Sequence, residues 1–87
     1  MKFYYVYVLN SLKSNWIYVG STSDLRARFK SHNNKENYST KKYTPFELIF
    51  YEAYRSKKDA LRRELYFKTT KGKTTLITML KDYFSKE

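Results

Sequence analysis

Four features of the sequence carry side chains that could do chemistry together. Arg28 and His32 lie four residues apart, so a helix would present them on one face. Glu64 falls within the apolar stripe of a later helical stretch, where a carboxylate is unexpected unless it has a partner. Tyr7 closes a Tyr-Val-Tyr run, and Tyr18 opens a Tyr-Val-Gly run on the next strand. Because a guanidinium holds phosphate oxygens in a fork, a phosphate-bearing substrate is the first to consider.

The composition narrows the partners that such residues could serve. The chain of 87 residues carries 18 Lys and Arg against 8 Asp and Glu, a formal net charge of +10. This charge attracts polyanions, and ten Tyr and six Phe offer rings for base stacking, so nucleic acid is the favoured partner. The chain has no Cys, which excludes disulfides, cysteine nucleophiles and cysteine zinc sites. Its single His excludes any site that needs two imidazoles from one chain.

We expect one domain over residues 1–87, in the cytoplasm, without a membrane partner. The chain lacks the run of about 18 apolar residues that spans a bilayer. Its first ten residues carry one charge and an apolar run of seven, which is typical of a strand rather than of a signal peptide. An anionic membrane surface competes for the positive charge, but the predicted helices leave no wide apolar face for it.

A small α+β fold must position these residues. Aromatic and β-branched runs predict strands over residues 3–9, 16–19 and 46–54, with the second strand ending at Gly20. The first strand is apolar throughout and should be buried on both faces. The order ββα-β-αα predicts a three-stranded antiparallel sheet flanked by three helices. The helices are expected over residues 25–33, 57–69 and 74–84.

Capping residues and breaks set the expected ends of these helices. Ser23 or Asp24 can cap the first helix, and Ser56 with Asp59 resembles a capping box for the second. Residues 70–73 contain a glycine between lysines and predict a break, and residues 33–42 lack periodicity and predict a loop. The expected apolar contacts of the second helix are Ala60, Leu61, Leu65 and Phe67.

The ordered motifs resemble those of the GIY-YIG nuclease domain family. YVY at residues 5–7 is similar to the first motif, with Tyr in place of its glycine, and YVG at residues 18–20 is similar to the second. The run YVGSTSDLRARFKSHN places the family's arginine on Arg28, and DALRRE places its metal-binding glutamate on Glu64. The likeness covers residues 3–84 and is nearest to the short, stand-alone branch of the family.

The resemblance implies a metal-dependent endonuclease that hydrolyses DNA phosphodiester bonds with Mg²⁺ or Mn²⁺ at Glu64. It also implies that Tyr7 or Tyr18 is the general base or proton relay; we favour Tyr7 as the base and Tyr18 as the group that positions water or phosphate. Arg28 would hold the phosphate, and His32, where many members have Tyr, would bind phosphate or relay a proton. Further expected contacts to nucleic acid are Gly20, Ser21, Lys41, Lys42 and Lys68.

Each of these residues also has an ordinary structural interpretation. Glu64 could pair with Lys68 one helical turn later, and Gly20 could serve a turn with positive φ. Trp16 is most simply a packing residue of the hairpin. The functional alternative is a non-catalytic nucleic-acid-binding module, although such a module has no use for a carboxylate that faces phosphates.

No base-reading element is visible, so we expect little sequence specificity and a possible preference for nicked, flapped or branched DNA. The protein would act as a monomer or weak dimer. We further expect the tyrosines, Arg28, His32 and Glu64 to converge on one concave face.

Overall fold

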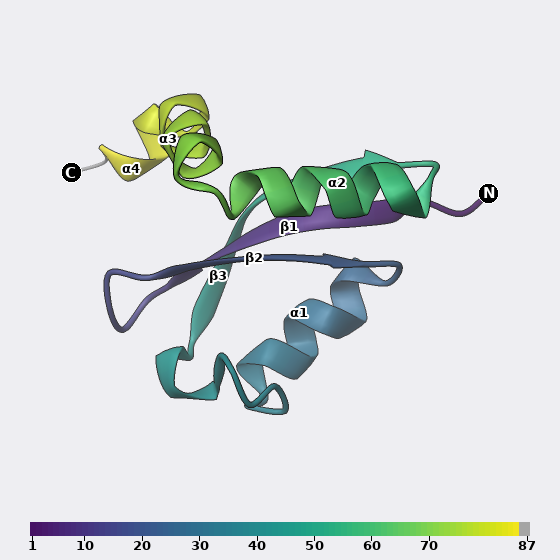
Figure 1. Ribbon diagram of the computed structural model, residues 1–87. Helices are drawn as coiled ribbons and strands as arrows, with labels where there is room; N and C mark the ends of the chain where they lie inside the picture. The colour runs from purple at the N-terminus through teal and green to yellow at the C-terminus, as the bar shows by residue number, and fades with distance from the viewer. Residues whose placement is uncertain (86–87) are drawn as a thin grey trace.

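The computed structural model describes residues 1–85 and confirms the α+β class (Figure 1). Strands β1 (Tyr4–Ser11), β2 (Ile17–Thr22) and β3 (Phe46–Tyr54) form one antiparallel sheet in the order β2-β1-β3. β1 is therefore the central strand, and β2 and β3 each have a free edge. The first two strands form the expected hairpin.

Helices cover the two faces of this sheet unequally. Helix α1 (Leu25–Asn33) lies on one face, whereas α2 (Lys57–Phe67) and α3 (Thr70–Met79) lie on the other (Figure 1). A short helix α4 (Lys81–Phe84) follows α3, and a 3-10 turn η1 (Lys41–Tyr43) precedes β3. No helix within residues 1–85 is long and apolar enough to cross a membrane.

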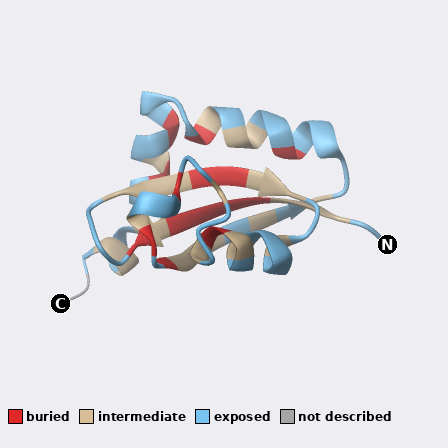
Figure 2. Ribbon diagram, turned by 90° about the horizontal axis from the view of Figure 1, so that it is seen from below, coloured by how far each residue is buried: buried red, intermediate tan, exposed pale blue. Residues whose placement is uncertain are grey.

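Alternation along β1 builds a separate core on each face. Val6 and Val8 are fully buried and pack with Phe67 and Leu76 from α2 and α3. Tyr7 and Leu9 are fully buried on the opposite face, in a cluster that includes residues from α1 and the segment before β3 (Figure 2). The prediction of a first strand buried on both faces is thus confirmed, because side chains alternate between the faces of a strand.

The second strand does not end at Gly20 as expected. It continues to Thr22, and Gly20 pairs with Tyr7 of β1 in the antiparallel register. The positive φ considered for Gly20 is also absent, since neither glycine of the described chain has one. Gly20 therefore lies inside a strand, and backbone conformation does not explain why this position is a glycine.

Helices α1 and α2 begin at the predicted residues, but only α1 has the predicted cap. Asp24 caps α1 by accepting a hydrogen bond from the Ala27 amide at 3.1 Å. Within the described residues, Ser56 makes no capping bond with its side chain, and Asp59 instead pairs with Arg62 at 2.9 Å. The arginine one turn later competes for the carboxylate that a capping box needs.

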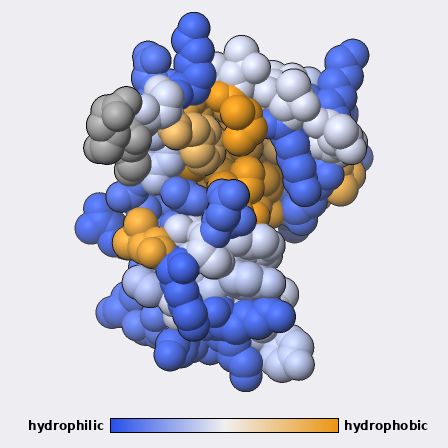
Figure 3. Space-filling model, turned by 90° about the vertical axis from the view of Figure 1, so that its left-hand side faces the viewer, coloured by the Kyte–Doolittle hydropathy of each residue, from blue (hydrophilic) through white to orange (hydrophobic). Residues whose placement is uncertain are grey.

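The apolar face of α2 is narrower than expected. Ala60 and Phe67 are buried, but Leu61 and Leu65 are 41% and 65% exposed. Ala60 and Phe67 are seven residues apart and so lie on one line facing β1. Leu61 and Leu65 lie off that line, which accounts for their exposure. Hydrophobic side chains gather over the upper part of one side of the molecule, where α3 lies, and that side is mostly hydrophilic elsewhere (Figure 3).

The predicted break at residues 70–73 is wrong, and α2 ends at Phe67 rather than at Thr69. Thr69 caps α3 by accepting a hydrogen bond from the Gly72 amide at 2.9 Å, so the glycine lies in the first helical turn. The break between α2 and α3 falls at residues 68–69 instead, and a further break at Leu80 divides the expected last helix into α3 and α4. A Cβ on Gly72 would lie 1.8 Å from the Tyr66 carbonyl oxygen, so close packing against α2 explains this glycine.

The long segment between α1 and β3 is tied down despite its lack of periodicity. The Asn33 side chain accepts from the Phe46 amide at 2.7 Å and donates to the Phe46 carbonyl at 3.2 Å, which joins the end of α1 to the start of β3. Trp16 stacks on Tyr43 with ring centroids 3.8 Å apart, which confirms its packing role. These contacts hold the segment over the α1 face of the sheet.

Candidate active site

The centre of the candidate site is a buried hydrogen bond between β1 and α1. The Tyr7 hydroxyl lies 2.8 Å from Nε2 of His32, and both residues are fully buried. Nδ1 of His32 lies 2.9 Å from Oγ1 of Thr40, which is fully buried as well. The imidazole is thus held at both nitrogens, which fixes the orientation of the ring.

The hydroxyl of Thr40 indicates the direction of these bonds. It donates to the Asn37 carbonyl at 3.4 Å, which leaves its oxygen free to accept from His32. Nδ1 of His32 then carries the ring proton, and Nε2 accepts from the Tyr7 hydroxyl. These two hydrogen bonds are oriented so that a proton can move from the Tyr7 hydroxyl to Nε2 of His32.

Burial keeps both the Tyr7 phenol and the His32 imidazole neutral. Desolvation raises the pKa of Tyr7 to about 12, helped by the neighbouring Tyr18 and opposed by the charge of Arg28. Desolvation also lowers the pKa of His32 below its usual value, and the Arg28 charge lowers it further. At neutral pH the pair is therefore a phenol and a neutral imidazole.

Gly20 makes room for the phenol. A Cβ at this position would lie 2.6 Å from the Tyr7 hydroxyl oxygen and 2.9 Å from Cε2 of Tyr18. Such distances require one of the rings to move. The rings of the two motif tyrosines thus pack directly against the Gly20 backbone. This close approach accounts for a glycine inside β2.

Tyr18 lies beside this pair on the edge strand. Its ring centroid is 6.3 Å from that of Tyr7 and 5.2 Å from that of His32. Trp16 lies on its other side at 6.2 Å. Tyr18 is only partly buried, so part of its side chain reaches the surface beside the buried pair.

Glu64 is held at the surface of α2 by two partners. The Ser21 hydroxyl donates to Oε1 at 2.7 Å, and the Lys68 ammonium lies 2.8 Å from Oε2. The Glu64 side chain is 15% exposed and that of Lys68 is 45% exposed. The helix pair considered from sequence is therefore present, together with a contact to β2. Lys68 also lies 5.8 Å from the Tyr18 ring centroid.

The structure differs from the expected single concave face. Helices α1 and α2 cover opposite faces of the sheet (Figure 1), so Arg28 and Glu64 start from opposite sides. They approach each other around β2, the edge strand. A hollow there is lined by Arg28, Ser21 and Ala60, from α1, β2 and α2 in turn. The charges of Arg28 and Glu64 both act on the pKa of Tyr7, so the groups surround one edge.

The donor set around Glu64 suits a divalent cation that brings further ligands. No group of three or more His, Cys, Asp or Glu side chains within residues 1–85 could hold a metal ion. Mg²⁺ accepts a single carboxylate because it keeps several waters and takes oxygens from substrate phosphates. Since Lys68 occupies one carboxylate oxygen, a cation must displace its ammonium. The residues therefore fit Mg²⁺ or Mn²⁺ bound jointly with a phosphate.

The remaining predicted nucleic-acid contacts fall into two groups. Gly20, Ser21 and Lys68 belong to the cluster at β2, as described above. Lys41 and Lys42 are exposed in η1, where their ammonium groups lie 4.9 and 5.3 Å from the rings of Tyr38 and Tyr43. No contact found in the described part of the chain joins these two lysines to Tyr7, Arg28 or Glu64.

Thr40 is the site residue that sequence reasoning missed. It lies in the aperiodic segment 33–42, eight residues from the imidazole that it contacts. A threonine among Ser, Asn and Lys residues carries no local signal of burial. Its role follows only from the path of the segment over α1.

Comparison with known proteins places these residues in a family. Residues 3–77 match the GIY-YIG catalytic domain. The UPF0213 protein YazA from Bacillus subtilis is 39% identical over 66 residues, which cover 75% of this chain and 66% of the relative. A UPF0213 protein from Streptococcus agalactiae is 35% identical over 81 residues, 90% of this chain and 91% of the relative.

A solved structure resembles the fold as well. The solution NMR structure of the UPF0213 protein BH0048 from Bacillus halodurans is 32% identical to this chain, with a TM-score of 0.55. The similarity covers 88% of this chain and 84% of that chain.

Proposed function

Because the chain belongs to the GIY-YIG catalytic domain family, and within it to the UPF0213 proteins, we propose that it is a metal-dependent endonuclease that hydrolyses DNA phosphodiester bonds. The net charge of +10 supports DNA as the substrate, because phosphate contacts dominate nucleic-acid affinity. Phosphate contacts carry no sequence information, so we also propose cleavage with little sequence specificity.

The observation that carries the proposal is the Tyr7–His32 hydrogen bond, placed beside Arg28 and across the β2 edge from Glu64. Packing alone does not require a buried phenol linked to a buried imidazole, because two apolar side chains would fill the same space with no polar group to satisfy. The hydrogen-bonded pair is suited to moving a proton at one defined atom, the Tyr7 hydroxyl oxygen.

In this mechanism Tyr7 relays a proton and never persists as a phenolate. Because desolvation raises the pKa of Tyr7 to about 12, the side chain is a phenol at neutral pH. The attacking water gives its proton to Tyr7 while Tyr7 passes its own to Nε2 of His32. The imidazolium returns the proton through the Tyr7 hydroxyl to water after the phosphodiester has been cleaved, and the leaving oxygen takes up a proton from solvent.

Arg28 and Glu64 act on the negative charge of the phosphate in this mechanism. The exposed Arg28 guanidinium binds the phosphate oxygens and stabilises the negative charge that grows on them during attack. Glu64 would hold a Mg²⁺ or Mn²⁺ ion, which would supply positive charge to the phosphate and to the leaving oxygen. Tyr18, which lies beside the buried pair and is partly exposed, positions the water or the phosphate.

One observation favours the second candidate, a nucleic-acid-binding module without catalysis. Glu64 already has two partners, Ser21 and Lys68, so its carboxylate has a structural use without a metal. Under this interpretation Glu64 links α2 to β2, and the positive charge alone supports binding.

The test compares Glu64→Ala and Arg28→Ala with wild type on supercoiled and branched DNA, with Mg²⁺ or Mn²⁺. We expect Glu64→Ala to lower the cleavage rate by about 100-fold or more, because the phosphate charge is no longer neutralised. Its DNA affinity should stay unchanged or rise, because a negative charge is gone. Arg28→Ala should lower both rate and affinity, with a salt slope shallower by about one.

Glu36→Ala is the matched control, since Glu36 is exposed in the segment between α1 and β3. It removes the same charge and should leave the cleavage rate unchanged.

If wild type neutralises about five phosphates, log K for DNA binding should fall with log salt at a slope of about −4 to −5. Wild-type binding without cleavage on any of these substrates would favour the binding module, and full activity in Glu64→Ala would refute the site assignment.

A further inference from the structure

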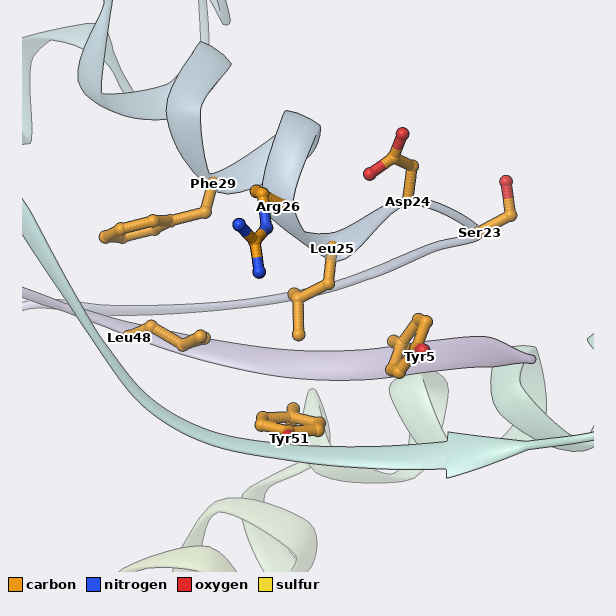
Figure 4. A pocket seen from close by; sticks show the side chains of 8 residues that line it. All are labelled: Tyr5, Ser23, Asp24, Leu25, Arg26, Phe29, Leu48 and Tyr51. Atoms are coloured by element: carbon orange, nitrogen blue, oxygen red, sulfur yellow. The ribbon is translucent and has the colours of Figure 1, made fainter. Parts of the chain in front are cut away.

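We propose that a second hollow, on the far side of α1 from Arg28, binds an unpaired nucleobase of the DNA strand. This tyrosine groove has Tyr5, Leu48 and Tyr51 as its floor and Leu25, Arg26 and Phe29 as its wall (Figure 4). Its volume is about 490 Å³, within the range of sites for small ligands. The inference rests on the proposed function in taking DNA as the ligand.

The floor of the groove is an aromatic platform on the sheet. The Tyr5 and Tyr51 rings meet edge to face, with centroids 6.0 Å apart and planes at 65°. Tyr51 is 54% exposed, although it lies on a strand whose other residues mostly pack. An exposed ring on a rigid sheet can stack with any base, because every base has a π face.

The wall of the groove supplies a cation above this platform. Arg26 extends from α1 toward the strands, between Leu25 and Phe29 (Figure 4). A guanidinium stacks on flat rings and also donates hydrogen bonds to base edges or phosphates. An apolar peptide would leave this charge without a partner, whereas a nucleotide supplies both a flat base and a phosphate.

Asp24 at the same groove defines how a strand could enter. Its carboxylate caps α1 through the Ala27 amide and repels phosphate. A phosphate backbone would therefore pass outside Asp24, whose carboxylate points away from the tyrosine floor, while the base turns inward onto the rings (Figure 4). The groove is thus suited to the base of a nucleotide rather than to its phosphate.

The groove is continuous with the candidate active site. Ser23, at the N-terminal end of α1, lines both this groove and the hollow that holds Arg28. Tyr5 and Tyr7 point to the same face of β1, about 6.8 Å apart along the strand. A strand held by Arg28 could therefore bend around the start of α1 and place a neighbouring base on Tyr51. This arrangement favours substrates with unpaired bases next to the cut, such as flaps and gaps.

The test measures binding without catalysis, by fluorescence anisotropy in EDTA. The probes are a thymidine oligonucleotide of about 12 residues and an abasic backbone of the same length and charge. We expect Tyr51→Ala to weaken binding of the thymidine strand by roughly 5- to 150-fold, the value of one stacked base, and to leave binding of the abasic strand unchanged. Tyr51→Phe keeps the ring and should bind both strands as wild type does.

Tyr38→Ala is the matched control, because Tyr38 is 85% exposed and lies outside the groove. It should not discriminate between the two strands. An equal loss on both strands in Tyr51→Ala would overturn the proposal, as would a change in sedimentation of the DNA-free variant, which would identify the groove as an interface between copies. Cleavage with Mg²⁺ is measured separately on Glu64→Ala, so failure of the nuclease proposal leaves the stacking result intact.

Discussion

The two sides of the candidate site are built in opposite ways. On the α1 side, Tyr7, His32 and Thr40 are fully buried and joined by hydrogen bonds between uncharged groups. On the α2 side, Glu64 and Lys68 form an ion pair that remains partly open to solvent. One side is a closed polar chain and the other is a charged contact at the surface.

This difference matches two needs of the proposed reaction: the proton relay must keep a fixed geometry, and the carboxylate must be able to exchange its partner for a cation. Buried hydrogen bonds hold their geometry because leaving one unmade costs the full desolvation of the group. A partly exposed ion pair contributes about 0–1 kcal/mol and opens readily. The proton relay can therefore be preorganised, while the carboxylate stays available for a cation that arrives with the substrate. The predictions below test this contrast.

The largest expected effect on the cleavage rate comes from filling the space beside the Tyr7 hydroxyl. Gly20→Ala places a methyl group 2.6 Å from the Tyr7 hydroxyl oxygen and should move the phenol away from His32. We expect overpacking to cost about 1–3 kcal/mol of stability, and loss of the relay to lower the cleavage rate by about 10²–10⁴-fold. Thermal unfolding and single-turnover cleavage measure the two effects.

Gly72→Ala is the comparison for this variant. Its new methyl group would meet the Tyr66 carbonyl on the α2 side, where no part of the relay lies. Because that neighbour is backbone rather than a ring, the stability loss should exceed that of Gly20→Ala, yet the folded fraction should cleave at the wild-type rate. If both variants lose activity in proportion to stability, the buried chain has no special role.

The next effect is the acid sensitivity of the buried side. The pKa of His32 is lowered in the folded state, whereas an unfolded His titrates near 6.5. As pH falls below about 6.5, the unfolded chain takes up a proton before the folded one does, so the free energy of unfolding should fall. His32→Gln lacks this titration and should show a weaker dependence between pH 8 and pH 5 in urea denaturation.

The cleavage rate supplies a second measurement on the same group. The relay needs a neutral imidazole, so wild-type activity should persist at pH 6.5 and fall only as pH passes below the lowered pKa of His32. A rate that already halves near pH 6.5 would contradict a buried, neutral His32.

The smallest effect tests the exchangeable side. Lys68→Met frees one oxygen of Glu64, so Mn²⁺ should bind the DNA-free protein a few-fold more tightly, as measured by electron paramagnetic resonance. Stability should change by less than about 1 kcal/mol. Lys73→Met, on α3, is the control for the loss of one positive charge. Equal gains in both variants would show that the Lys68–Glu64 pair does not limit access of the cation.

Much of the local structure was predictable because it depends on neighbours in sequence. Alternation of side chains along a strand is enough to bury Val6 and Tyr7 on opposite faces. The four-residue spacing of Arg28 and His32 places them on one side of α1, and the charge of Arg28 indeed acts on the imidazole. These relations hold whatever the rest of the chain does.

The tertiary structure decided the relations between distant segments. Gly20 and Gly72 look alike in sequence, but one makes room for a phenol across a strand register and the other for a carbonyl across a helix contact. The partner of His32, Thr40, is set by the course of an aperiodic segment, and α1 and α2 were free to lie on the same or opposite faces. Sequence patterns report the period of one element, whereas close approaches depend on how elements pack, which no local pattern encodes.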